Sequence, residues 1–212
     1  MSNRWEEIRP QVEAERLSLV KFLEGLREDE WAVRSLCTDW TVHEVLAHLT
    51  LSTRTGVKDW LKGLAQARFD FDRMESQQGR ERAAQYSPAE LIEQYRETAG
   101  STRRSPLSGA MDPLVDVLVH GQDIARPLGR EREIPLKLLP GALDHLWNSP
   151  FYGVKKRFRG TRMIATDVQW TAGDGPAEVR GPATELLLAA TGRPSGLDNL
   201  QGEGVELVRA TL

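Results

Sequence analysis

One stretch of the sequence, DPLVDVLVHGQD, carries the residue types that bind divalent metal ions at the spacing of a helix. Asp116, His120 and Asp123 follow one another at intervals of four and three residues. On a helix, these intervals place the three side chains within about 60° of one another, as one polar stripe. Most other residues of the stretch are apolar, which predicts a helix buried over most of its circumference. Buried carboxylates and imidazoles need partners, and a bound cation is one such partner.

A second helix carries another histidine that can join this stripe. In the segment TVHEVLAHLT, Thr41 and Glu44 have capping-box spacing, which predicts a helix that begins near Val42 and runs to about Lys62. His48 lies on the flank of the apolar face of this helix. The segment therefore predicts an imidazole at the edge of the helix that enters the core.

The two helices together predict a metal site. As antiparallel neighbours in a bundle, they bring His48, Asp116 and His120 to one point, with two imidazole nitrogens and one carboxylate oxygen. This donor set suits Zn²⁺ with a free fourth position, and it also fits Ni²⁺, Fe²⁺ or Mn²⁺. Asp123, one turn beyond His120, is predicted to accept the proton of the other imidazole nitrogen and so to orient the ring. The alternative interpretation of the same spacing is a polar stripe that faces water.

Three further residues have ligand-type side chains, and we assign them other roles. His43 is expected to be a solvated or capping residue at the start of its helix. His145 is expected to be structural or partly exposed, although it is the obvious substitute ligand. Cys37 is the only cysteine. It has no adjacent histidine or basic pair, so we interpret it as a small packed residue.

Hydrophobic periodicity and capping signals predict an α+β fold that is mainly α. A helical body is expected over residues 1–155 and a small α/β module over residues 156–212. The segment 67–86 is polar and is predicted to be a loop. Helices are expected at residues 4–26, 42–62, 88–100, 112–126, 136–148 and 181–193, and strands at 163–170, near 177–180 and at the end of 200–208. On the first predicted strand, one face carries Ile164, Thr166, Val168 and Trp170.

Composition excludes several classes of protein. The formal net charge of −3 over 212 residues offers no broad positive surface for nucleic acid or an anionic membrane. No apolar run is long enough for a membrane helix, and MSNRWEEIRP is too polar for a signal peptide, so we expect a cytoplasmic protein. A single cysteine rules out an internal disulfide and a thiolate cluster. Motifs for nucleophile-elbow hydrolases, nucleotide hydrolysis and dinucleotide binding are absent from the sequence.

Three segments resemble the mycothiol-dependent maleylpyruvate isomerase family. They are CTDWTVHEVLAHLT, DVLVHGQDI and the tail that begins with FRGTRMIATDVQW. The resemblance implies a DinB-like four-helix bundle followed by a sterol-carrier-like α/β module. It also implies a divalent metal, usually zinc, at the positions of His48, Asp116 and His120. The family more often has Glu where this chain has Asp116, and the loss of one methylene shortens the reach by about 1.5 Å, which affects denticity or metal choice.

The resemblance further implies an enzyme that uses mycothiol as cosubstrate and is actinobacterial. We expect an isomerase or S-transferase that acts on a small electrophile, with a small-molecule thiol and the electrophile as partners and no nucleic acid or membrane. A monomer or homodimer is expected. Asp123 and Arg193 are the expected catalytic residues. Arg193, after the last predicted helix, suits a clamp for a substrate carboxylate, although it also fits a surface arginine at a helix C-terminus. The alternatives are a non-catalytic protein that binds metal or a small molecule, and a metal-assisted hydrolase in which water is the nucleophile.

Overall fold

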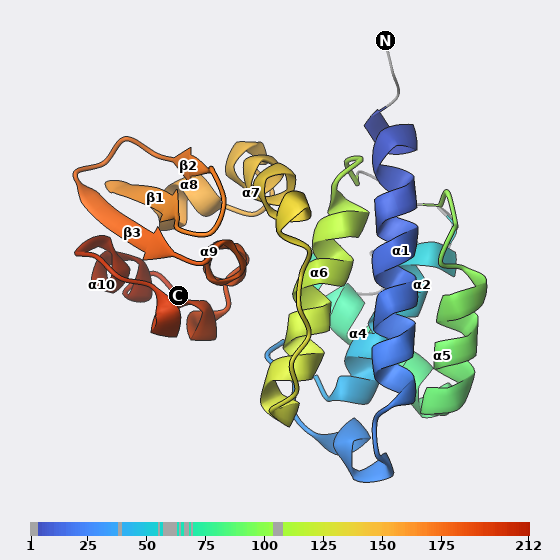
Figure 1. Ribbon diagram of the computed structural model, residues 1–212. Helices are drawn as coiled ribbons and strands as arrows, with labels where there is room; N and C mark the ends of the chain where they lie inside the picture. Colours follow the sequence, from blue (N-terminus) through green and yellow to red (C-terminus); the bar gives the residue numbers. More distant parts are fainter. Residues whose placement is uncertain are drawn as a thin grey trace. The chain divides into compact units, whose positions relative to one another are not determined.

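The computed structural model describes residues 4–37, 40–54, 70–103 and 108–212, together with residues 56, 63, 65 and 68. The chain forms two compact units, Met1–Arg132 and Glu133–Leu212. This division falls before the boundary that the sequence predicts after residue 155, because the helix at 139–148 packs against a helix of the C-terminal unit. The architecture is mainly helical with a small sheet in the C-terminal part, as the sequence predicts (Figure 1).

Helices make up the regular structure of the first unit. They are α1 (Arg4–Glu24), η1 (Glu28–Ala32), α2 (Val42–Arg54), α4 (Phe71–Gln85), α5 (Pro88–Glu97), α6 (Asp112–Ala125) and η2 (Arg126–Leu128). Four of these helices form a closed ring of contacts, in the order α1, α6, α2, α5 and back to α1. This ring is the predicted four-helix bundle. The fifth long helix, α4, packs against α2.

Local capping signals explain where two bundle helices begin. The Ser87 hydroxyl accepts a hydrogen bond from the Glu90 amide at the start of α5, and the Glu90 carboxylate accepts one from the Ser87 amide at 2.8 Å. At the start of α2, the Thr41 amide donates to the Glu44 carboxylate at 2.7 Å, and the Glu44 amide donates to the Thr41 hydroxyl. Both capping boxes satisfy amides that the first helical turn leaves without a partner. The sequence prediction of both helix starts is confirmed.

The predicted loop at 67–86 is wrong, because most of it forms α4. Asp70 caps this helix by accepting a hydrogen bond from the Arg73 amide at 3.0 Å. Met74 and Gly79 are buried, and an added Cβ at Gly79 would lie 3.6 Å from the Trp40 ring. The contact with the rest of the bundle, rather than hydrophobic periodicity, therefore holds α4 in place. The part of the second predicted helix from residue 55 to Lys62 lies outside the described residues, apart from residue 56.

The second unit combines helices with a three-stranded sheet. Its elements are η3 (Leu136–Leu138), α7 (Leu139–Asn148), α8 (Val154–Arg157), β1 (Thr161–Ala165), β2 (Thr171–Ala172), β3 (Ala177–Gly181), α9 (Ala183–Ala190), η4 (Pro194–Asn199) and α10 (Gly204–Arg209). The strand order is β2-β1-β3. β1 pairs antiparallel with β2 and parallel with β3, with Met163 opposite both Ala172 and Val179. α9 packs against both β1 and β3.

Two predictions for this unit need correction. β1 ends at Ala165, so it is shorter than the strand predicted over residues 163–170, and its buried face carries Thr161 and Met163. The last segment is the helix α10 and not a strand. In α10, Val205 and Val208 are both buried at a spacing of three, so the apolar residues follow a helical period.

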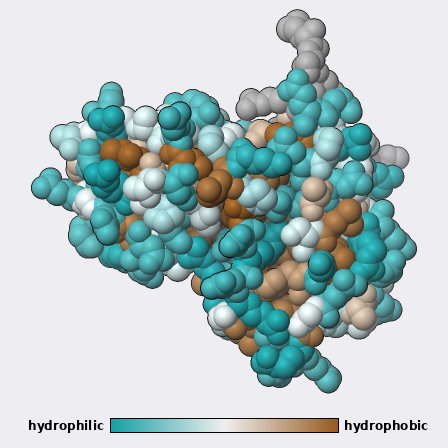
Figure 2. All heavy atoms as spheres, viewed as in Figure 1, coloured by the Kyte–Doolittle hydropathy of each residue, from teal (hydrophilic) through white to brown (hydrophobic). Residues whose placement is uncertain are grey.

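Hydrophilic side chains cover most of the face shown in Figure 2, with smaller areas of apolar side chains between them. Large apolar residues are mostly buried, and the exposed ones are scattered along the chain at Leu17, Leu136, Phe151, Leu207 and Leu212. No helix in the described part of the chain is long and apolar enough to cross a bilayer.

Candidate metal centre

The three predicted ligands meet at one point inside the first unit. One ligand atom from each of His48, Asp116 and His120 lies within 4.8 Å of the other two. His48 Nε2 is 3.6 Å from Asp116 Oδ1, and His120 Nε2 is 3.4 Å from the same oxygen. The two imidazole rings have centroids 5.0 Å apart and meet at 71°. The predicted convergence of the two helices is therefore confirmed.

The elements explain this convergence. Asp116 and His120 are one turn apart on α6, so their side chains lie on the same face of the helix. His48 comes from α2, which packs directly against α6. Both imidazoles are largely buried, whereas 26% of the Asp116 side chain is exposed. The stripe on α6 therefore does not face bulk water along its length, and solvent reaches the group from the side of Asp116.

The separations fit ligands of one ion better than direct hydrogen bonds. A distance of 3.6 Å is too long for a nitrogen–oxygen hydrogen bond. A tetrahedral ion with bonds of about 2.0–2.1 Å holds its ligand atoms about 3.3–3.4 Å apart. The observed 3.4 and 3.6 Å lie close to that spacing. Two neutral imidazoles and one carboxylate are also a common ligand set for zinc with a free position.

Electrostatics keep the carboxylate ionised, as a ligand must be. Burial by itself raises the pKa of Asp116, but the interactions with His48, with His120 and with Arg16 of α1 together outweigh it. The pKa of Asp116 is therefore lowered from its ordinary value of 3.8. A deprotonated carboxylate is present at neutral pH without any help from a metal.

Asp123 holds the His120 ring from the opposite side, as predicted. His120 Nδ1 is 2.8 Å from Asp123 Oδ2, and Asp123 is fully buried. When an imidazole donates a hydrogen bond from Nδ1–H to a carboxylate, its Nε2 carries no proton and can bind a metal ion. Nε2 is the nitrogen that faces Asp116, so this hydrogen bond sets the tautomer that coordination requires.

Two residues near the site were missed by sequence reasoning. The Trp40 ring lies over both imidazoles, with its centroid 4.8 Å from that of His48 and 6.3 Å from that of His120. Glu75 of α4 has its Oε2 3.8 Å from His48 Nδ1. It therefore faces the Nδ1 of His48, as Asp123 faces the Nδ1 of His120. Glu75 could not be placed because its segment was predicted to be a loop. The only signal for Trp40 was an aromatic residue just before the capped helix.

Cys37 is interpreted from the sequence as a small packed residue, with no sign of the histidine that lies near it. Its sulfur lies within 4.8 Å of ligand atoms of both His120 and Asp123. The side chain is half-buried. The contact joins residues 83 positions apart, so no local pattern could reveal it.

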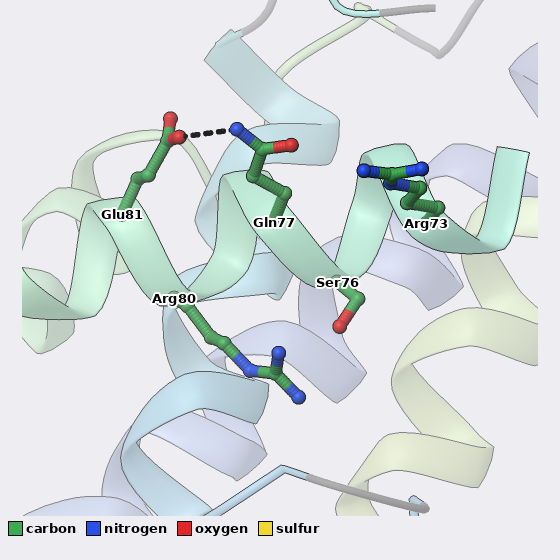
Figure 3. Close-up of a pocket in the computed structure, with 5 residues that line it drawn as sticks. All are labelled: Arg73, Ser76, Gln77, Arg80 and Glu81. Atoms are coloured by element: carbon green, nitrogen blue, oxygen red, sulfur yellow. Dashed lines mark hydrogen bonds between the residues drawn. The ribbon is translucent and has the colours of Figure 1, made fainter. Parts of the chain in front are cut away.

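A surface pocket of about 310 Å³ lies elsewhere on the first unit, along α4. Figure 3 shows its lining residues, which are Arg73, Ser76, Gln77, Arg80 and Glu81. Gln77 donates a hydrogen bond to Glu81 at 2.8 Å across its rim. None of the three candidate ligands lines it, so this pocket is separate from the metal centre.

Comparison with known proteins now gives the family. Residues 12–125, more than half of the chain, match the family described as the mycothiol maleylpyruvate isomerase N-terminal domain. The chain belongs to this family. No curated protein matches it. The matched region contains the three candidate ligands, as well as Cys37 and Asp123.

Solved structures of a mycothiol-dependent maleylpyruvate isomerase share the fold of this family member. One is 14% identical with a TM-score of 0.61, and a mutant of that enzyme with one histidine changed to alanine is 14% identical with a TM-score of 0.53. Each match covers 96% of both chains. The similarity therefore extends beyond the matched domain, through both units.

The remaining predicted residues lie as follows. His43 is half-buried, and its Nε2 lies 3.0 Å from the carbonyl oxygen of Tyr86. His145 is half-buried on α7 and belongs to neither ligand group found among the described residues, so its structural role is consistent with the prediction. In the second unit, Arg193 Nη1 donates to the Thr191 carbonyl at 2.7 Å, in the turn after α9. Its role as a carboxylate clamp stays a prediction.

Proposed function

We propose that this chain is a metal-dependent enzyme that uses mycothiol as cosubstrate and acts on a small electrophile, as an isomerase or an S-transferase. Family membership and the shared fold support the thiol and the reaction class. The observation that carries the proposal is the triangle of His48, Asp116 and His120, because its spacing fits one divalent ion with a position left for sulfur.

Zn²⁺ is the proposed ion, with Ni²⁺ or Fe²⁺ as other candidates for the same donors. When bound, such an ion would supply a Lewis acid that lowers the pKa of a thiol and so makes thiolate available at neutral pH. His48 and His120 contribute no charge in their neutral forms, and Asp116 contributes one negative charge. One divalent ion with this set keeps a net positive charge, which favours an anionic sulfur ligand over a neutral one.

The other residues of the site are proposed to orient the ligands and the electrophile and to limit the access of water. Asp123 holds His120 in the tautomer that leaves Nε2 free. The Trp40 ring packs at a tilt beside both imidazoles, and its proposed role is to limit the access of water to them. Arg193 is the proposed clamp for a carboxylate of the electrophile, since a guanidinium binds a carboxylate through two parallel hydrogen bonds.

In the isomerase form of the proposal, the thiolate adds to a carbon–carbon double bond of the electrophile. A carbon–sulfur bond forms while the double bond becomes a single bond that can rotate. Elimination breaks the carbon–sulfur bond, restores the double bond in the other geometry and regenerates the thiolate. In the transferase form, the new carbon–sulfur bond is kept, and the neighbouring carbon, which received the electron pair of the double bond, takes up a proton from solvent.

Metal content is the first test. The protein, purified without added metal or chelator, should contain about one divalent ion per chain after metal titration, and His48→Ala and His120→Ala should lose it. His145→Ala is the matched control, because this histidine lies in neither ligand group, and it should bind metal normally. Equal metal in all four proteins would show that the site is assigned wrongly.

Thiol dependence is the second test. The metal-loaded protein is incubated with an electrophilic alkene, with and without mycothiol. We expect turnover of the alkene only when mycothiol is present, and we expect His48→Ala to show no turnover. Turnover that needs no thiol would favour the metal-assisted hydrolase, and metal binding without any turnover would favour the binding protein.

A further inference from the structure

Cys37, His120 and Asp123 form a second group of ligand atoms that the proposed function does not use. The cysteine sulfur, an imidazole nitrogen and a carboxylate oxygen all lie within 4.8 Å of one another. Two ligands of one ion with bonds of about 2.0–2.3 Å are at most about 4.6 Å apart. Three ligands around one ion lie closer together, at about 3.3–4.0 Å, so the side chains would move together by up to about 1.5 Å for all three atoms to reach one ion.

The backbone holds Cys37 in this position. The Cys37 amide donates to the Ser35 hydroxyl at 3.1 Å, and the Trp40 amide donates to the Cys37 carbonyl at 3.1 Å. The Leu36 amide donates to the Asp123 carbonyl at 3.1 Å, which fixes this turn directly on α6. The sulfur is thus placed by a hydrogen-bonded turn rather than by a free loop.

The two ligand groups share His120, and their carboxylates face opposite nitrogens of its ring. Nε2 faces Asp116 at 3.4 Å, whereas Nδ1 faces Asp123 at 2.8 Å. The donors on the Nε2 side are nitrogen and oxygen only. Cys37 adds a sulfur donor to the group that contains Asp123, and thiolate sulfur selects softer cations than nitrogen or oxygen does.

We propose that Cys37, His120 Nδ1 and Asp123 form a binding site for a soft divalent cation, with Cd²⁺ as its representative. Binding releases the thiol proton to solvent, and the Nδ1 proton of His120 is exchanged through solvent for one on Nε2, so that Nδ1 is left without a proton. A neutral imidazole binds metal through one nitrogen while the other keeps the proton. An ion at this second site therefore takes the ring away from the first ligand group, and soft cations displace the ion that His48, Asp116 and His120 bind.

The single cysteine makes the test clean. A thiolate bound to Cd²⁺ gives a charge-transfer absorption band in the ultraviolet, and in this chain only Cys37 can produce it. The metal-free full chain is titrated with Cd²⁺ while this band and the oligomeric state are measured. We expect a band that saturates with one Cd²⁺ per chain in a species of unchanged size.

Variants separate this site from the first one. Cys37→Ser should lose the band and keep the Zn²⁺ affinity of the first ligand group. His48→Ala should keep the band although it loses Zn²⁺. Asp123→Asn should weaken the affinity for Cd²⁺, measured from the absorption band, at least tenfold. In the wild type, Cd²⁺ should release bound Zn²⁺ at a concentration at least tenfold lower than in Cys37→Ser.

The inference is overturned by any of three results. One is the absence of the band in wild-type protein that is folded and exposed to excess Cd²⁺. Another is a band of unchanged affinity in Asp123→Asn. The last is a band that appears only in a larger species, in which two cysteines from two chains bind one ion. None of these results bears on the proposed function, which fails if His48→Ala and His120→Ala keep their Zn²⁺, if turnover needs no thiol, or if the metal-loaded protein shows no turnover.

Discussion

Replacement of Asp123 by Asn is the sharpest test of how the site is oriented. The change keeps the shape of the side chain and an oxygen that can accept the His120 Nδ1 proton, but it removes the charge. A hydrogen bond to a charged group contributes about 1.5–3 kcal/mol, against about 0.5–1.5 kcal/mol for a neutral one. The loss of about 1–1.5 kcal/mol corresponds to roughly a tenfold weaker affinity for Zn²⁺.

Asp123→Ala removes the acceptor altogether, and we expect a loss nearer to a hundredfold, the upper end for groups that orient a metal-bound histidine. The assay is competition for Zn²⁺ with a chromophoric chelator at fixed pH. Asp144→Asn is the matched control, because Asp144 also accepts a side-chain hydrogen bond, from Trp170 Nε1 at 2.8 Å, but lies in the second unit. If folded Asp123→Asn binds Zn²⁺ within twofold of wild type, Asp123 does not orient His120.

Two further predictions concern stability. Gly121→Ala should lower the free energy of unfolding in urea by about 1–3 kcal/mol, because the new methyl group would lie 2.7 Å from the buried Arg132 guanidinium. Gly25→Ala is the control: its new methyl group would have no contact closer than 3.4 Å, so the free energy of unfolding should change little. The hydrogen-bonded Arg130 guanidinium lowers the pKa of Glu30 below 4.5, so the stability that this pair adds is present above that pH and is lost as the pH falls through the lowered value. The urea midpoint of wild type should therefore exceed that of Arg130→Met at neutral pH, and this difference should become smaller as the pH falls below 4.5. A difference that does not change with pH would contradict this prediction.

The sequence predicted those elements whose signals are local. Capping boxes and apolar stripes gave the bundle helices α1, α2, α5 and α6. The polar segment of α4 has almost no apolar face, so its packing on α2 depends on residues that are distant in the sequence. Asp70 as a cap was the one available sign. In α10, Val205 and Leu207 suggested alternation, but Leu207 is exposed, and the spacing of Val205 and Val208 is what matters.

The metal centre could be predicted only in part for the same reason. Asp116, His120 and Asp123 share one helix, so their relation follows from helical geometry. His48 required the further assumption that two helices are neighbours in a bundle. Cys37 and Trp40 lie outside helices and strands, and hydrogen bonds such as that between Leu36 and Asp123 determine where Cys37 lies. No spacing rule predicts such a contact.

The location of every donor atom in the N-terminal unit has an evolutionary consequence. Mutations in Glu133–Leu212 leave the identity of the donors unchanged, since His48, Asp116 and His120 all precede that unit. Selection can therefore diversify the C-terminal unit while the three candidate ligands stay the same. Relatives with very different C-terminal sequences are expected to retain the same pair of histidines and the acid between them.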